Sequence, residues 1–237
     1  MDEYTLFLNT THDPKSFIIK DVIPDGDCGF RACALNLNIY NLNLIDLLEK
    51  SNFENINDKN FNYKKNNSNK KWEGWDYKGK KLEHASKKLR EITVKYILCN
   101  WNNPLTDQYL IIDTNNNTLG KYTLEYHDFS SKKIYGKEYL ENEEQSSWVG
   151  NPELYALSKI FGVTINVYGL FRFFKNQSTT KMVKLYKNRK VPINTRIRLI
   201  QVIGSKYESS KHGIDLLYEY DEKGLNHYLF IKNKNLL

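Results

Sequence analysis

The chain has 237 residues, of which 40% are hydrophobic, so it is long enough to bury one sizeable core and fits one domain better than two. No apolar run approaches the ~18 residues that span a bilayer, and no basic stretch followed by an apolar one opens the chain, so we expect an intracellular, cytoplasmic protein with no membrane contact. The formal charge of +7 would suit nucleic-acid binding, but no helix-turn-helix, zinc-finger or RNP-type pattern accompanies it.

The N-terminal region predicts strands that lead into a helix. Residues 4–8 read as a short strand, and the β-branched run from Phe17 to Ile23 reads as a longer one. A tight acidic turn follows at Asp25 to Asp27. From Cys28 to about Asn38 apolar or small residues recur at helical spacing, so Cys28 lies in the first turn of the predicted helix. A short second helix is predicted around Ile45, Leu47 and Leu48.

The position of Cys28 at a helix start suggests chemistry. Unpaired amides of the first turn and the helix dipole favour a thiolate over a thiol, and the thiolate is the nucleophile. The same amides could hold an oxyanion. An ordinary buried cysteine would give the same pattern. From these residues alone the two interpretations have equal weight.

Residues 51–81 are polar and rich in Asn and Lys, and they predict an irregular insertion. Its densest basic stretch, Tyr63 to Trp72, interleaves lysines with aromatics as a base-stacking surface would. Because Asn and Lys are enriched throughout the chain, a solvated insertion is the preferred interpretation. Trp72 and Trp75 either anchor a partner or pack onto the body.

The next helix is predicted to end near Asn100, with Lys87, Lys88 and Arg90 on its solvent face. Residues 101–147 mix a short apolar run with turns and an acidic stretch, and they predict a second irregular insertion. The apolar face of the predicted helix comprises Leu82, Ala85, Leu89, Ile92, Tyr96 and Ile97.

A third helix is predicted after Trp148. Asn151 is the expected N-cap, Pro152 suits the first helical position, and Glu153 complements the positive helix start. Gly162 is expected to end the helix. We interpret Trp148 and Glu153 as structural residues, a packing aromatic and a helix-start carboxylate. The predicted buried stripe comprises Leu154, Leu157, Ile160 and Phe161.

The residues after Gly162 are predicted to form strands. Alternating residues after Gly162 indicate one strand, and a hairpin loop is expected at Asp221 to Gly224. His227 begins the last predicted strand, but position alone does not distinguish it from His12, His84, His127 or His212. The other predicted strands are Arg196 to Ile203, Ile214 to Tyr220 and His227 to Lys232.

Three segments together carry a resemblance to a known family. Residues Asp25 to Ala32 resemble the Asp-Gly-x-Cys-x-Phe-Arg-Ala signature of the ovarian tumour (OTU) family of cysteine deubiquitinases. The segment from Trp148 is similar to the family's Trp-x-Gly-x-x-Glu-Leu-x-Ala-Leu, and Asn226 to Tyr228 resembles the His-Tyr that begins its last strand. The three matches occur in the family's order over roughly residues 17 to 232.

The resemblance implies an α+β fold of the papain-like superfamily, with a small, mostly antiparallel sheet flanked by helices. One domain would cover residues 1–237, with irregular insertions at about 51–81 and 101–147. The implied activity is thiol-dependent hydrolysis of (iso)peptide bonds at the C-terminus of ubiquitin, a polyubiquitin chain or a ubiquitin-like modifier. Cys28 would be the nucleophile and His227 its base. We expect a monomer that needs no metal and no cofactor.

The resemblance also implies the remaining site residues. Backbone amides of Asp25, Gly26 and Cys28 would form the oxyanion hole. Many family members carry Asn or Asp two residues after the histidine, where this chain has Leu229, which cannot accept an imidazole N–H. Asp25 is predicted to replace it, as the aspartate three residues before the cysteine does in part of the family. A purely turn-forming aspartate is the equal alternative, and Asn226 is a weaker candidate.

Two other functions stay open at this point. One is a protease of the same fold that processes a polyprotein, and the other is a catalytically weak ubiquitin-binding module. Nucleic-acid binding ranks last. The three cysteines, Cys28, Cys33 and Cys99, form no Cys-x-x-Cys pair and are odd in number, so they support neither a disulfide framework nor a zinc site and suit a reducing compartment.

Overall fold

The structure is a computed structural model that describes residues 10–39, 80–105, 117–140, 148–172, 181–186, 189–204, 213–220 and 226–234. Several predictions concern residues outside these ranges. They are the strand at 4–8, the short helix around Ile45, residues 51–79 of the first predicted insertion with its basic stretch from Tyr63 to Trp72 and Trp75, His212, and the loop from Asp221 to Gly224.

A six-stranded sheet forms the centre of the fold, in the order β1-β6-β3-β7-β8-β2. Its neighbours pair antiparallel except β3 and β7, which are parallel. The sequence prediction of an α+β class with a mostly antiparallel sheet is therefore confirmed. The strands are β1 (Thr11–His12), β2 (Phe17–Lys20), β3 (Ile165–Arg172), β6 (Thr195–Ile203), β7 (Ile214–Tyr220) and β8 (Asn226–Asn233), and a separate hairpin joins β4 (Met182–Tyr186) to β5 (Arg189–Pro192).

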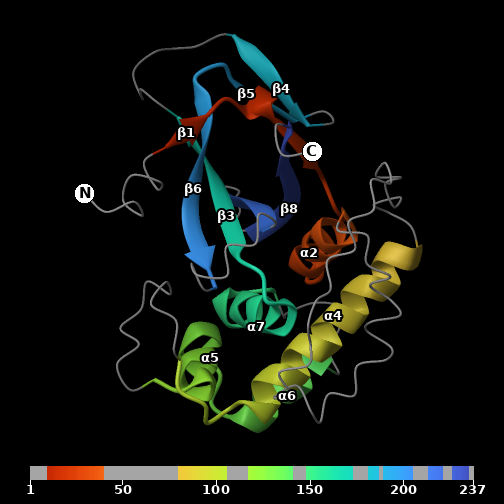
Figure 1. The fold of residues 1–237 in the computed structure, drawn as a ribbon, viewed down its shortest axis with the longest axis vertical. Helices are drawn as coiled ribbons and strands as arrows, with labels where there is room; N and C mark the ends of the chain where they lie inside the picture. The colour runs from red at the N-terminus through yellow and green to blue at the C-terminus, as the bar shows by residue number, and fades with distance from the viewer. Residues whose placement is uncertain are drawn as a thin grey trace.

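The helices gather at one side and one end of this sheet (Figure 1). Helix α2 packs against β7 and β8, and α4 in turn packs against α2, α6 and α7, so α2 lies between the sheet and the helical layer. No helix in the described ranges is long and apolar enough to cross a membrane. The helices are α2 (Cys28–Ile39), α4 (Lys80–Cys99), α5 (Leu119–His127), α6 (Lys132–Leu140) and α7 (Asn151–Phe161), and a 3-10 turn, η1, covers Pro14–Ser16.

Two hydrophobic clusters lie on opposite faces of the sheet. The larger one joins the helices to one face and includes Phe30, Cys33 and Leu37 from α2. Leu229 belongs to the smaller cluster on the other face and is 0% exposed, so this position serves packing. The other buried members of the small cluster are Phe17, Ile197, Leu217 and Ile231.

Helix α7 differs from its prediction by one residue at the start. Gly150, rather than Asn151, is the N-cap, and its N–H donates to Glu153 Oε2 at 2.8 Å. The Glu153 carboxylate, three residues into the helix, therefore satisfies the backbone N–H of the N-cap residue. A polar side chain at the N-cap position is not needed. Gly162 ends the helix in the left-handed conformation at φ 60°, as predicted.

Helices α5 and α6 lie within residues 101–147, which the sequence had predicted to be irregular. Both are nine residues long and expose polar faces, so their apolar pattern is weak. Both are fixed by packing, because Tyr135 and Tyr139 of α6 and Leu119 and Tyr122 of α5 are buried in the large cluster.

A buried ion pair fixes β8 against β7. Lys232 Nζ lies 3.1 Å from Asp215 Oδ2, and both side chains are almost completely buried. Asp215 also accepts from Asn166 Nδ2 at 2.9 Å on β3. The pair and the Asn166 contact therefore tie together three adjacent strands, one of which, β8, carries His227 as its second residue.

Replacing Lys232 by methionine is expected to lower the free energy of unfolding by about 3 kcal/mol, because it leaves the carboxylate of Asp215 buried without its cation. Urea denaturation measures the change. Lys133→Met, on the exposed side of α6, is the control and should change stability by less than about 0.5 kcal/mol. Equal stabilities for the two variants would contradict the importance of the pair.

Candidate active site

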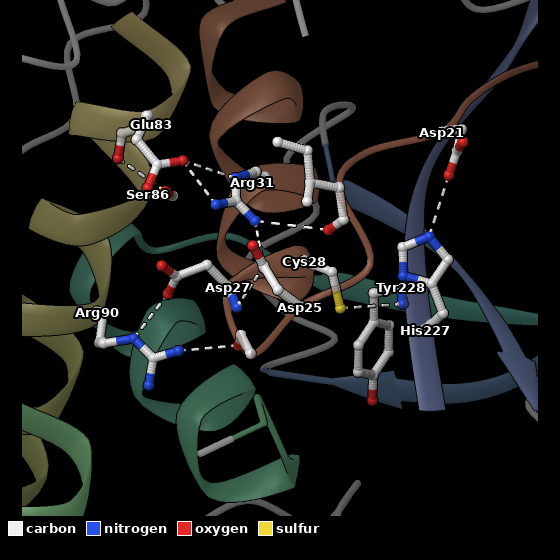
Figure 2. A network of polar contacts seen from close by, with 12 residues as sticks. Asp21, Asp25, Asp27, Cys28, Arg31, Glu83, Ser86, Arg90, His227 and Tyr228 are labelled. Carbon is white, nitrogen blue, oxygen red and sulfur yellow. Dashed lines mark hydrogen bonds and ion pairs between the residues drawn. The ribbon is translucent and has the colours of Figure 1, made fainter. Parts of the chain in front are cut away.

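Cys28 is the first residue of α2 and faces β8. The preceding turn is closed by a hydrogen bond from Cys28 N–H to Asp25 O at 3.0 Å, and the helix begins with Arg31 N–H donating to Asp27 O at 2.9 Å. The thiol is 1% exposed. Tyr228 N–H, at the start of β8, points at the sulfur with an N···Sγ distance of 3.5 Å (Figure 2).

The environment of Cys28 holds a neutral thiol in this conformation. Burial raises the pKa of Cys28 to about 12, and the nearby carboxylate of Asp25 acts in the same direction. The backbone N–H groups of Tyr228 and Gly29 lower the pKa of Cys28, as the helix-start interpretation predicts, but they do not overcome the loss of water.

His227 lies beside this thiol and is held by a carboxylate from another strand. Its Nε2 is 3.1 Å from Asp21 Oδ1, and the histidine side chain is 13% exposed. Nδ1 is buried and has no hydrogen-bond partner among the described residues. Figure 2 shows this second ring nitrogen on the side of the ring that faces the sulfur of Cys28.

The Asp21 contact fixes the tautomer of His227. A carboxylate only accepts hydrogen bonds, so the hydrogen of the neutral imidazole must be on Nε2. The lone pair is then on Nδ1, the nitrogen directed at the thiol. A neutral thiol therefore faces a nitrogen that can take its proton.

Strand pairing explains why Asp21 reaches His227. Strand β2 runs antiparallel to β8 with Lys20 opposite Phe230, so the chain leaving β2 passes beside the start of β8. Side chains alternate between the faces of a sheet, which puts Asp21 and His227 on the same face, as diagonal neighbours across the two strands.

Two roles for Asp25 were equal from the sequence, orienting His227 or forming the turn, and its observed contacts are with the turn and with α2. Its carboxylate pairs with Arg31 Nη1 and accepts from Asp27 N–H at 2.9 Å. Arg31 lies in the first turn of α2, where its guanidinium reaches back to the acidic turn, and it also binds Glu83 at 2.6 Å. The carboxylate that the structure places at His227 belongs to Asp21.

Arg90 also differs from its prediction. The sequence placed it on the solvent face of α4, but it is 3% exposed. Its Nε donates to Asp27 Oδ1 at 2.7 Å and its Nη2 to Gly26 O at 2.8 Å. The buried carboxylate of Asp27 explains the difference, because it gives the guanidinium a partner inside the protein.

The three predicted oxyanion amides are not equally available. Asp25 N–H donates to Ile23 O and Cys28 N–H to Asp25 O, both at 3.0 Å. Only Gly26 N–H lacks an acceptor among the described residues. An oxyanion could be bound by all three amides only after the loop releases the other two.

Glu153 and Trp148 contact the helical layer. Glu153 is 0% exposed and accepts from Tyr135 OH at 2.8 Å, and His127 Nε2 is 3.0 Å from Glu153 Oε2. Trp148 O accepts from Tyr139 OH at 2.7 Å. These contacts link α5, α6 and the start of α7 and do not involve the thiol.

Sequence reasoning missed Asp21, although the sequence held a signal for it. Aspartate is depleted in strands, yet Asp21 falls within the β-branched run from Phe17 to Ile23. The structure ends β2 at Lys20, so Asp21 is the first residue past the strand.

No three His, Cys, Asp or Glu side chains of the described ranges are grouped so as to hold a metal ion.

Comparisons with known proteins agree with the sequence motifs. A family model described as OTU-like cysteine protease matches residues 23–212, a stretch that includes Cys28 and ends before His227. No curated protein matches the chain. Among solved structures, the chain is similar to the OTU domain of OTUD1, with 13% identity, a TM-score of 0.43 and coverage of 98% of this chain and 99% of that one. It is also similar to the viral OTU domain protease from Dera Ghazi Khan virus, with 14% identity, a TM-score of 0.42 and coverage of 94% and 87%.

The raised pKa of Cys28 predicts a steep pH dependence of its reactivity. Only the thiolate reacts with iodoacetamide, so the alkylation rate of Cys28 should increase about tenfold per unit between about pH 7 and pH 10. The rate is read from the mass of the Cys28 peptide in a Cys99→Ser background, because Cys99 is exposed. A rate that is constant over this range would instead indicate a thiolate already formed at neutral pH.

Proposed function

Since the chain belongs to the family of OTU-like cysteine proteases, we propose that it is a deubiquitinase, which cleaves peptide or isopeptide bonds at the C-terminus of ubiquitin or a ubiquitin-like modifier. The observation that carries the mechanism is the contact of His227 Nε2 with Asp21, which leaves Nδ1 without a partner among the described residues, on the side of the ring that faces Cys28 (Figure 2). Family membership supports the choice of substrate.

The first half of the reaction forms an acyl-enzyme. The Cys28 thiol gives its proton to His227 Nδ1 as the sulfur attacks the carbonyl carbon of the modifier's C-terminus. Because burial raises the pKa of Cys28 in the resting conformation, the thiol keeps its proton until a substrate exposes the sulfur and His227 takes that proton. The C–N bond of the tetrahedral intermediate then breaks, and the leaving amine takes the proton from Nδ1.

The second half of the reaction releases the modifier. His227 Nδ1 takes a proton from water, the hydroxyl oxygen attacks the thioester carbon, and the C–S bond breaks. The sulfur recovers its proton from His227, and the modifier leaves with a free carboxylate. Throughout the cycle Asp21 stabilises the imidazolium that forms twice and keeps the ring turned toward the sulfur.

The negative charge that develops on the substrate's carbonyl oxygen during the attack must be stabilised by hydrogen-bond donors near the start of α2. Gly26 N–H is available in the resting loop, and Cys28 N–H joins it when the bond to Asp25 O opens. A lost oxyanion donor typically costs about 10²- to 10³-fold in rate. Substrate binding must also expose the sulfur, which is almost completely buried at rest.

A ubiquitin with a C-terminal electrophile tests the activity directly. Wild-type protein should form a covalent adduct that denaturing electrophoresis detects, and Cys28→Ala should form none. A panel of ubiquitin-like modifiers with the same electrophile is run in parallel. If no member of the panel labels the wild type, or if Cys28→Ala labels equally, the proposed function is wrong.

The orienting carboxylate is tested by paired variants. Asp21→Ala should lower kcat about 10²-fold with little change in KM, because general-base catalysis contributes about 10² to 10⁴ and depends on the ring orientation. Asp21→Asn should recover part of the loss, since the amide oxygen still accepts the Nε2 hydrogen. Hydrolysis of a fluorogenic ubiquitin C-terminal amide gives both constants.

Asp25→Asn is the matched control, because the amide oxygen can still accept from Asp27 N–H. We expect it to retain kcat within about threefold, because the Asp25 carboxylate is partly exposed and does not contact His227. A large loss in the Asp25 variant together with full activity of Asp21→Ala would reverse the assignment.

A further inference from the structure

Arg90 holds the loop that precedes the nucleophile, although it lies 62 residues away from Cys28 in the sequence. One guanidinium group on α4 contacts both the Asp27 carboxylate and the Gly26 carbonyl, at 2.7 and 2.8 Å. The same group lies over the Phe30 ring of α2, at 4.9 Å from its centroid. Contacts with the acidic turn and with α2 therefore fix its position.

Asp27 occupies the N-cap position of α2, since its carbonyl accepts the first helical hydrogen bond, from Arg31 N–H. An aspartate at this position normally accepts from amides of the first turn. In this protein its carboxylate turns toward Arg90 instead, and no amide of that turn donates to it. The amides of Gly29 and Tyr228 are directed at the Cys28 sulfur.

If the Asp27 carboxylate were released from Arg90, one other set of hydrogen-bond donors would lie near it. It is 5% exposed, so it cannot gain full hydration without moving, whereas the amides of the first turn of α2 lie within the same turn of chain. Capping those amides would bring a negative charge to the sulfur and remove the N–H that favours the thiolate.

We propose that Arg90 is a positioning residue that keeps the Asp27 carboxylate away from the N-terminus of α2, so that the first-turn N–H of Gly29 remains directed at Cys28. Arg90 touches neither the sulfur nor a substrate and acts through Asp27. The inference rests on the proposed thiol mechanism and concerns the reactivity of Cys28, which can be measured without any substrate.

The test is the rate of Cys28 alkylation by iodoacetamide at pH 8 in the full chain carrying Cys99→Ser. In this reaction the sulfur displaces iodide at a saturated carbon, so no oxyanion forms and ubiquitin is not needed. Arg90→Gln should lower the rate about tenfold, which is the effect expected of an added negative charge and a lost amide at a helix start. Adding Asp27→Asn should restore the rate to within about threefold of wild type, because the charge is then absent.

A purely structural role for Arg90 predicts a different outcome. In that case Arg90→Gln lowers the melting temperature while the folded protein alkylates at the wild-type rate, and this result would overturn the proposal. So would a slow rate that Asp27→Asn fails to restore. Lys95→Gln, which removes an exposed ion pair with Glu91 on the same helix, is the control and should leave the rate unchanged.

Arg90→Lys keeps the test decisive if Arg90→Gln does not fold. The lysine retains the charge but has a single point of attachment, so it should hold the carboxylate less firmly than the two-pronged guanidinium. Alkylation is then expected to slow about threefold, and Asp27→Asn in the same chain should again restore it. Because alkylation needs no ubiquitin, its result stands whether or not the electrophile-bearing modifiers label the protein.

Discussion

The antiparallel pairing of β2 with β8 is the constraint on which the site depends. Through it the residue that follows β2, Asp21, comes within 3.1 Å of His227, and β8 presents Tyr228 N–H to the sulfur of Cys28. Cys28 itself is carried by α2, which packs against β7 and β8. One pair of strands therefore brings together two ends of the chain that are separated by about 200 residues, at the cost in loop-closure entropy that such contacts require.

Around the nucleophile, charge is arranged to keep the loop fixed and the sulfur neutral. Arg31 holds Asp25, and Arg90 holds Asp27, so both carboxylates of the acidic turn have a cation partner on a helix. Burial then keeps the thiol protonated, which protects it from oxidation and from small electrophiles because only the thiolate reacts readily. Reactivity would appear when a substrate displaces the loop and His227 takes the proton. As a consequence, the site must open and expose the Cys28 sulfur before the thiol can react with a substrate.

Much of this arrangement could be predicted from the sequence. The helix starting at Cys28, the strand Ile214 to Tyr220 and the Gly162 helix end follow from local rules of periodicity and capping, and the structure has them. What failed depended on partners distant in sequence. Predicting that Asp21 lies near His227 would have required the β2–β8 register. Predicting that Arg90 is buried would have required knowing that Asp27 contacts α4. Helix α6 was missed because two buried tyrosines, rather than an apolar stripe, hold it in place.

The central claim is that Asp21 fixes His227 as the Nε2–H tautomer with its Nδ1 lone pair toward Cys28. The most direct test is the ¹⁵N NMR spectrum of the histidine ring nitrogens in the unliganded protein, with the His227 signals assigned by comparison with a His227→Gln variant. In the spectrum of the neutral ring, the account predicts a hydrogen on Nε2 and none on Nδ1, and a mixture of tautomers once Asp21 is replaced by alanine. A ring protonated at Nδ1 in the wild type, or a spectrum that the Asp21 substitution does not change, would contradict it.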